Sequence, residues 1–182
     1  MKKTVTPAIV ALLLVFLAGC SISGSGVEGS KEPFYGGMSV HVFDTFQDLE
    51  EESTLIILAE KTGNSMNKEV EFLNFTITEV KVAKVLKGDP SLLGKTVNIL
   101  EYAPVSMTTF DKEKRYVLFL YPHNGKIVEN GYWITGVYQG KFKLDKNDKL
   151  LYDAHKYGGV ITFQDELTGH TVLKLEGRLG QH

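Results

Sequence analysis

The amino-acid sequence predicts a mostly β protein, organised as a small antiparallel barrel with one or two short helices. From Thr54 onward, runs of roughly four to eight apolar and β-branched residues alternate with Gly, Asn, Asp and Pro, which is typical of short strands joined by turns. These runs follow one another closely, without the intervening helices that a parallel sheet requires. One long run also changes the parity of its apolar residues, which favours a curved barrel over a sandwich.

The individual elements follow in order along the chain. One helix is expected at Asp44–Ser53, where the capping-type Asp44 precedes two apolar residues at helical spacing. Strands are expected at Leu55–Ala59, Val70–Leu86, Val97–Tyr102, Tyr116–Tyr121, Tyr132–Val137, Lys141–Leu144 and Lys149–Tyr152. Tyr116–Tyr121 is apolar at nearly every position, as in a central strand covered on both faces. Thr168–Leu175 fits either a strand or a short helix.

The longest run, Val70–Leu86, supports the curvature of the sheet. Its apolar side chains occupy odd positions up to Ile77 and even positions from Val80 onward. Successive side chains of a strand point to opposite faces, so an inward face that changes parity requires an extra residue or a sharp bend. We therefore expect a β-bulge near Thr78–Glu79.

The N-terminal residues have the composition of an export signal. Lys2 and Lys3 form a positive start, and an unbroken apolar run follows at Ala8–Ala18. This run is shorter than the roughly 20 apolar residues of a membrane-spanning helix. Three parts of the chain are therefore expected: a cleaved signal peptide at 1–19, a flexible Ser/Gly-rich tether at 20–35 and a folded domain at 36–182.

The tetrapeptide Leu17-Ala18-Gly19-Cys20 resembles the lipobox of bacterial lipoproteins in residue type and in position. The resemblance implies that Cys20 receives a diacylglyceryl group, becomes the new N-terminus and holds the domain on the extracytoplasmic face of the cell membrane. Two acyl chains anchor a protein stably where one does not, since each buried methylene contributes about 0.8 kcal/mol. The membrane is therefore the first expected partner.

Composition and local motifs narrow the function classes. Cys20 is the only cysteine, so disulfides, thiolate catalysis and cysteine-based zinc sites are not expected. Loss of Lys2 and Lys3 would lower Lys+Arg from 20 to 18 against 22 Asp+Glu, a net charge of about −4 that argues against nucleic-acid partners.

The five histidines lack metal-ligand spacing, and His123 is expected on a solvated turn. Asp145–Lys149 resembles the start of a calcium loop but lacks its central Gly and distal Glu. A polar hairpin turn is therefore expected there.

No catalytic residue, metal ligand or cofactor is therefore assigned, although a triad could still assemble from distant residues. The candidate binding surface consists of Tyr132, Trp133 and Tyr138, because the faces of OB-type barrels can present aromatic platforms. Further tyrosines lie on neighbouring predicted strands, namely Tyr102, Tyr116 and Tyr121. Core packing is the competing explanation, since aromatic residues are common in half-buried strands.

Four segments together resemble the netrin-like domain of the tissue inhibitors of metalloproteinases, as found in bacterial lipoproteins: Phe46–Ala59, Phe75–Gly88, Tyr116–Leu120 and Gly136–Phe142. The resemblance covers most of the folded domain and implies a five-stranded OB-like barrel with a helix packed on it. The eukaryotic inhibitors use a disulfide-pinned N-terminal cysteine, whereas the single cysteine here is the expected lipid anchor. The resemblance is therefore applied to the fold and not to protease inhibition.

The expected function is that of a non-enzymatic, membrane-anchored extracytoplasmic module that binds a protein or another envelope ligand. The absence of catalytic motifs from the sequence favours this hypothesis. The alternative is a hydrolase that acts on envelope polymers through a site assembled from separated residues. A pocket with two or more ionisable groups within hydrogen-bond reach would favour the hydrolase.

Overall fold

The computed structural model describes residues 34–35, 38–39, 41–102, 110, 114–152 and 160–181. The predicted signal peptide, Cys20 and the tether up to residue 33 lie outside these residues. The elements are β1 (Phe34–Tyr35), β2 (Met38–Ser39), α1 (Phe46–Glu52), β3 (Leu55–Val70), β4 (Leu73–Lys87), the 3-10 turn η2 (Pro90–Leu92), β5 (Thr96–Tyr102), β6 (Arg115–Pro122), β7 (Gly131–Ile134), β8 (Lys141–Leu144), β9 (Leu150–Leu151), α3 (Gln164–Leu167) and α4 (Val172–Glu176). Among the described residues, no helix is long and apolar enough to cross a membrane.

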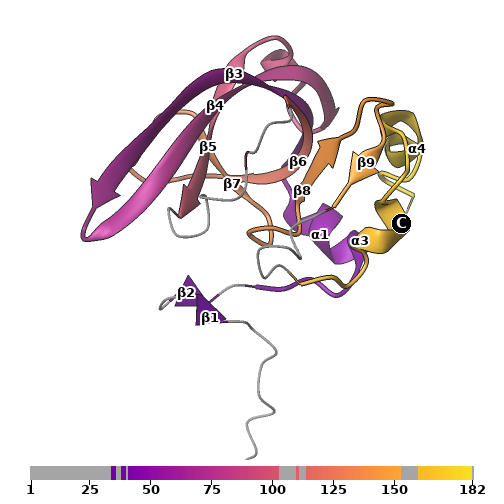
Figure 1. The fold of residues 1–182 in the computed structure, drawn as a ribbon, viewed down its shortest axis with the longest axis horizontal. Coiled ribbons are helices and arrows are strands. Elements are labelled where there is room, and N and C mark those ends of the chain that lie inside the picture. Colours follow the sequence, from indigo (N-terminus) through magenta and orange to yellow (C-terminus); the bar gives the residue numbers. More distant parts are fainter. Residues whose placement is uncertain are drawn as a thin grey trace, which may run out of the picture. The chain divides into compact units, whose positions relative to one another are not determined.

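The central feature is a ring of strands that closes on itself. The seven-stranded sheet has the order β3-β4-β5-β7-β6-β8-β9, and an additional pairing of β3 with β6 closes the first five strands into a barrel (Figure 1). β5 and β7 pair in parallel, whereas the other neighbours in the ring are antiparallel. This arrangement confirms the predicted mostly β, OB-like barrel.

The barrel interior is filled by apolar side chains from all five strands of the ring. They are Leu55, Ile57, Ala59, Val80, Val82, Val97, Ile99, Tyr116, Leu118, Leu120 and Ile134. β6 also contributes to a second core, because Val117 and Phe119 point to the outside of the barrel. This strand is therefore covered on both faces, as its continuous apolar sequence predicted.

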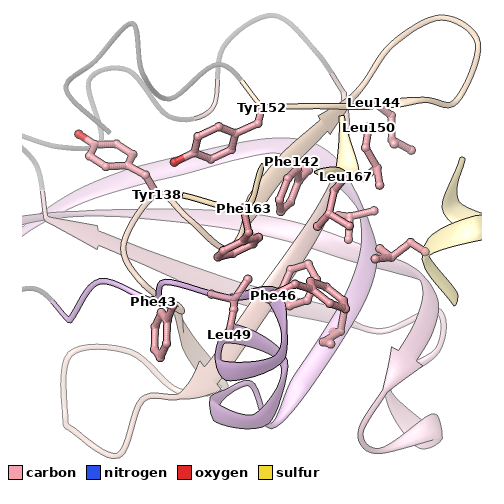
Figure 2. Packing of buried hydrophobic residues seen from close by; sticks show 14 of the residues in the cluster. Phe43, Phe46, Leu49, Tyr138, Phe142, Leu144, Leu150, Tyr152, Phe163 and Leu167 are labelled. Carbon is pink, nitrogen blue, oxygen red and sulfur yellow. The ribbon is translucent and has the colours of Figure 1, made fainter. Parts of the chain in front are cut away.

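The second core lies between the outer face of β3 and β6 and a cover made of α1, β8, β9 and the C-terminal helices (Figure 2). Phe119 of β6 makes edge-to-face contacts with Phe46 of α1 and Phe142 of β8, each at a ring distance of 6.0 Å. Thr45 caps α1, because its Oγ1 accepts a hydrogen bond from the Asp48 backbone N–H at 3.1 Å. The predicted cap, Asp44, is therefore wrong by one residue.

The parity change in β4 has a different cause from the one predicted. β4 pairs with β5 without interruption from Phe75 to Lys81, so β4 itself contains no bulge at Thr78–Glu79. The extra residues lie opposite, in β3, where the pairing jumps from Lys61 to Ser65 while β4 advances only from Val80 to Thr78. Phe75 and Ile77 are buried on the outside of the barrel, and Val80 and Val82 on the inside. β4 therefore buries its outer side up to Ile77 and its inner side from Val80 onward.

Beyond this irregularity, β3 and β4 continue together as an extension, here called the arm (residues 65–78), in which β5 still pairs with β4 from Phe75 to Thr78 (Figure 1). The sequence predicted only Leu55–Ala59 of β3, because residues 60–69 show no apolar alternation and are mostly exposed. The turn of the arm is formed by Glu71 and Phe72, which have φ angles of 50° and 69°. Two positive φ angles match the backbone twist of a two-residue hairpin, although Asn-Gly is the usual sequence.

The remaining elements differ from expectation mainly in their ends. β7 stops at Ile134 rather than Val137, because the chain turns at Gly136 and Val137, which have φ angles of 66° and 58°. The Asp145–Lys149 turn is confirmed, since Asp145 Oδ1 accepts hydrogen bonds from the backbone N–H groups of Asn147 and Lys149. The ambiguous C-terminal segment contains helix α4, which is capped by Thr171.

Candidate functional site

The outer side of the barrel carries a cluster of aromatic side chains from β4, β5, β6 and β7. We call it the aromatic face and define it as Phe75, Tyr102, Tyr121, His123 and Trp133. Phe75 lies between two partners, with its ring 6.1 Å from Tyr102 and 5.9 Å from Trp133, both in edge-to-face geometry. Tyr121 is the cross-strand partner of Trp133 and therefore lies on the same side of the sheet.

Two buried apolar residues, Ile77 and Leu100, support this face, and Tyr102 also packs against the second core. Ile77 and Leu100 are cross-strand partners that lie on the same side as Phe75, and they are 3% and 1% exposed. The first residue of β7, Gly131, lies close to Leu100 and to Val128 of the preceding loop. Gly131 allows this close approach, because a Cβ atom there would lie 2.7 Å from Leu100 Cδ1 and 2.8 Å from Val128 Cγ1.

His123 connects the loop to the aromatic face. The indole N–H of Trp133 donates to His123 Nδ1 at 3.1 Å, and the two rings lie 5.5 Å apart. The backbone N–H of Ile127 approaches Nε2 at 3.3 Å. A neutral imidazole has one accepting nitrogen, so only one of these contacts can be a full hydrogen bond, and protonation of the ring would remove both. His123 is half-buried, which corrects the expectation of a solvated turn residue.

A polar hollow opens in the same loop, next to His123. Its volume is about 630 Å³, and its lining consists of His123, Asn124, Gly125, Lys126, Val128, Glu129 and Asn130. The hollow offers amide, ammonium and carboxylate groups, and His123, which lines it, also contacts the ring of Trp133. Such a combination can bind a ligand that has both an apolar surface and hydrogen-bonding groups.

Tyr121 is the most accessible aromatic ring of the face, with 42% of its surface exposed. Partial burial raises the pKa of its phenol above the usual value of 10, because desolvation disfavours the charged form. The phenol is therefore protonated at neutral pH and can both donate and accept a hydrogen bond.

The three residues predicted as a binding surface are not brought together by the structure. Trp133 lies on the aromatic face, whereas Tyr132 packs against the barrel interior, because neighbouring residues of a strand point to opposite sides. Tyr138 is 6% exposed and belongs to the second core (Figure 2). The sequence analysis missed Phe75 and His123 as members of the face. The odd-numbered apolar residues of β4 were the available signal for Phe75.

The barrel also contains a buried ion pair, which bears on the hydrolase hypothesis. Lys141 Nζ lies 3.3 Å from Glu101 Oε1, and their side chains are 7% and 5% exposed. The ammonium group also lies 3.4 Å from the ring centroid of Phe110 and 5.4 Å from that of Tyr116. The two charges neutralise each other, and neither residue lines the hollow at His123 or a second hollow of about 320 Å³ beside α1.

The described residues were also compared with the requirements of a metal site. Among the residues that the structure describes, no three His, Cys, Asp or Glu side chains are grouped so that they could hold a metal ion. His155 and His182 lie outside the described residues.

No protein-family model matches the sequence, and a search of curated proteins finds no significant match.

Proposed function

We propose that this protein is a non-enzymatic binding module, held by a lipid on Cys20 at the extracytoplasmic face of the cell membrane, whose aromatic face binds a protein or another envelope ligand. The observation that carries the proposal is the grouping of Trp133, Tyr102, Phe75 and Tyr121 on the outside of an OB-like barrel. In barrels of this type, the outer face of neighbouring strands and the adjoining loops are the usual ligand-binding surface.

The surroundings of the face support binding rather than simple packing. Ile77 and Leu100 are sealed beneath it, but Tyr121 remains exposed and the rings of Trp133 and Tyr102 are only half-buried. Aromatic rings that are partly exposed beside polar groups are typical of binding sites, because one part of the ring meets apolar surface while the edge meets water. The hollow at His123 supplies the polar groups.

The membrane location rests on the lipobox Leu17-Ala18-Gly19-Cys20 and on the Ser/Gly-rich residues that follow it. A lipid on Cys20 and a flexible tether would let the barrel sample the space near the membrane surface. Membership of the netrin-like lipoproteins is part of the same proposal. The single cysteine supports an anchor in place of the disulfide-pinned terminus of the protease inhibitors.

The hydrolase alternative has weaker support. The most deeply buried ion pair described above, Lys141 with Glu101, is covered by Phe110 and Tyr116. A general acid or base must reach the proton that it transfers, whereas the Lys141 ammonium lies against the rings of Phe110 and Tyr116.

The proposal can be tested with the lipidated full-length protein in nanodiscs, using solubilised envelope proteins and envelope polysaccharide fragments as probes. Trp133 is the only tryptophan, so its emission reports directly on the aromatic face. We expect one fraction to shift this emission, and we expect Tyr102→Ala to weaken the binding at least tenfold. Leu93→Ala is a matched control, because Leu93 is 61% exposed in the turn between β4 and β5. Binding that is unchanged in Tyr102→Ala, or cleavage of a polysaccharide fragment, would contradict the proposal.

A further inference from the structure

The arm presents one edge of β3 without a partner strand among the described residues. Up to Glu60, β3 pairs with β6 on this edge, and the Lys61 backbone N–H donates to Lys114 O at 2.8 Å. From Thr62 to Val70, the described part of the chain pairs with β3 only on its other edge, through β4. Among the described residues, the barrel therefore closes at one end of this strand, and no strand pairs with this edge at the other end.

The hairpin turn determines which backbone groups point outward at this edge. Val70 and Leu73 flank a two-residue turn and are cross-strand partners, so they form a hydrogen-bonded pair. Hydrogen-bonded and non-hydrogen-bonded pairs alternate along an antiparallel ladder. The N–H and C=O groups of Ser65, Asn67 and Glu69 therefore point away from β4. They are spaced as an added strand would require.

Residues 65–70 contain neither a proline nor a bulge, and their charged side chains are Lys68 and Glu69. Natural proteins block such edges with proline, bulges or outward lysines. The irregularity lies nearer the barrel, at residues 62–64, where Thr62 Oγ1 accepts from the Asn64 N–H. Lys68 is the single lysine of the segment. Its ammonium group donates to Ile127 O of the β6–β7 loop and therefore does not extend from the edge.

Apolar side chains lie beside this edge and at the end of the arm. Met66 is 60% exposed, Leu73 36% and Phe72 94%. Phe72 has a φ of 69°, a left-handed conformation that a bulky residue rarely adopts. A large apolar residue at an exposed and strained position makes no contact that would stabilise the isolated fold. It is suited to contact with another molecule.

The charged side chains near this edge indicate which kind of molecule it binds. Glu69 lies on the opposite side of the strand from Met66, and Glu71 lies in the adjoining turn. An anionic membrane would be repelled by both carboxylates. A second copy of this chain would bring the same two carboxylates and only Lys68, which already binds Ile127 O. A segment with basic side chains complements the edge.

We propose that the open edge of β3 binds an extended segment of a protein partner, which adds as a strand beside Ser65–Val70. Its apolar side chains contact Met66 and Phe72, and its basic side chains face Glu69 and Glu71. The edge of β3 is separated from Trp133 on β7 by strands β4 and β5. It makes the protein a two-site adaptor whose second ligand is a protein chain recognised mainly through its backbone.

Amide hydrogen exchange of the full-length protein, followed by NMR, tests the proposal. The probe is the capped peptide Val-Lys-Val-Lys-Val-Lys-Val. In the free protein, we expect the amides of Ser65, Asn67 and Glu69 to exchange at least tenfold faster than those of Met66 and Lys68, which already donate to β4. With 1 mM peptide, exchange at those three positions should slow at least tenfold, while Trp133 emission stays unchanged.

Two controls separate backbone pairing from general attraction. The same peptide with alternate N-methylated residues keeps its charge but loses its N–H donors, and it should give no protection. The double variant Glu69→Lys, Glu71→Lys should prefer a Val-Glu peptide, and its Met66 and Lys68 amides report whether the arm is still folded. Absence of protection, or equal protection by the N-methylated peptide, would overturn the proposal. So would protection that rises with protein concentration alone, which indicates a second copy, or with phosphatidylglycerol vesicles, which indicates a membrane.

Discussion

Replacement of Lys141 by methionine tests whether the buried ion pair is a structural element of the barrel. Lys141 and Glu101 are almost fully buried, with 7% and 5% of their side-chain surfaces exposed, and their charged atoms lie 3.3 Å apart. Lys141→Met keeps the apolar stem but removes the cation, so the Glu101 carboxylate loses its counter-charge. Breaking a buried pair in this way costs about 3–5 kcal/mol. This is a large part of the roughly 5–15 kcal/mol that stabilises an ordinary domain.

Urea unfolding followed by Trp133 emission measures this cost. The double variant Lys141→Met, Glu101→Met removes both charges, and we expect it to recover most of the loss, because a buried pair replaced by apolar side chains is often neutral in stability. Lys84→Met provides a matched control. Lys84 Nζ lies 2.7 Å from Glu176 Oε2, but the two side chains are 46% and 34% exposed, so solvent screening limits the cost to about 0–1 kcal/mol.

The reasoning is refuted if Lys141→Met costs no more than Lys84→Met. It is also refuted if the double variant is less stable than the single one, because the carboxylate would then not be the source of the penalty. Loss of an activity in Lys141→Met without loss of stability would instead point to the hydrolase alternative.

Three further results are expected. His123→Phe removes the acceptor for the Trp133 indole, so we expect a changed Trp133 emission maximum and a loss of roughly 1 kcal/mol in urea unfolding; an unchanged spectrum would show that the contact does not form. Glu71→Asn with Phe72→Gly places favoured residues at the two positive φ angles of the turn. The free energy of unfolding should therefore rise by roughly 1 kcal/mol, although an exposed aromatic ring is lost. A decrease would show that Phe72 packs within the fold. Tyr121 has a raised pKa in the folded protein, so the unfolded chain loses this proton first and the free energy of unfolding should fall as the pH rises above 10. Tyr121→Phe should reduce this fall. The same dependence of stability on pH in both proteins would count against burial of the phenol.

Much of the fold could be predicted from the sequence because the barrel follows simple periodicities. The continuous apolar run of β6 indicated a strand between two cores, and the polar composition of Asp145–Lys149 indicated the turn that Asp145 caps in the structure. The outer half of β3 could not be found in this way, since residues 60–69 lack apolar alternation. Their strand structure depends on pairing with β4, which is a tertiary effect.

The aromatic face was only partly predictable. Trp133 was identified, but sequence proximity grouped it with Tyr132 and Tyr138, which lie in the barrel interior and the second core. Phe75 joins Trp133 from a strand that is distant in sequence, and His123 joins it from the loop that precedes β7. A strand that buries both faces gives the same parity change as a bulge, so one sequence alone cannot distinguish the two arrangements.

Site-specific photo-crosslinking on intact cells tests the central claim most directly, namely that the aromatic face is the ligand-binding surface. A benzophenone amino acid is placed at Tyr121, which is 42% exposed on the face, and in a separate strain at Leu93, which is 61% exposed in the β4–β5 turn. The account predicts a discrete adduct from position 121 that is absent from position 93 and is reduced by Tyr102→Ala. Equal labelling from both positions, or an adduct from position 93 alone, would contradict it.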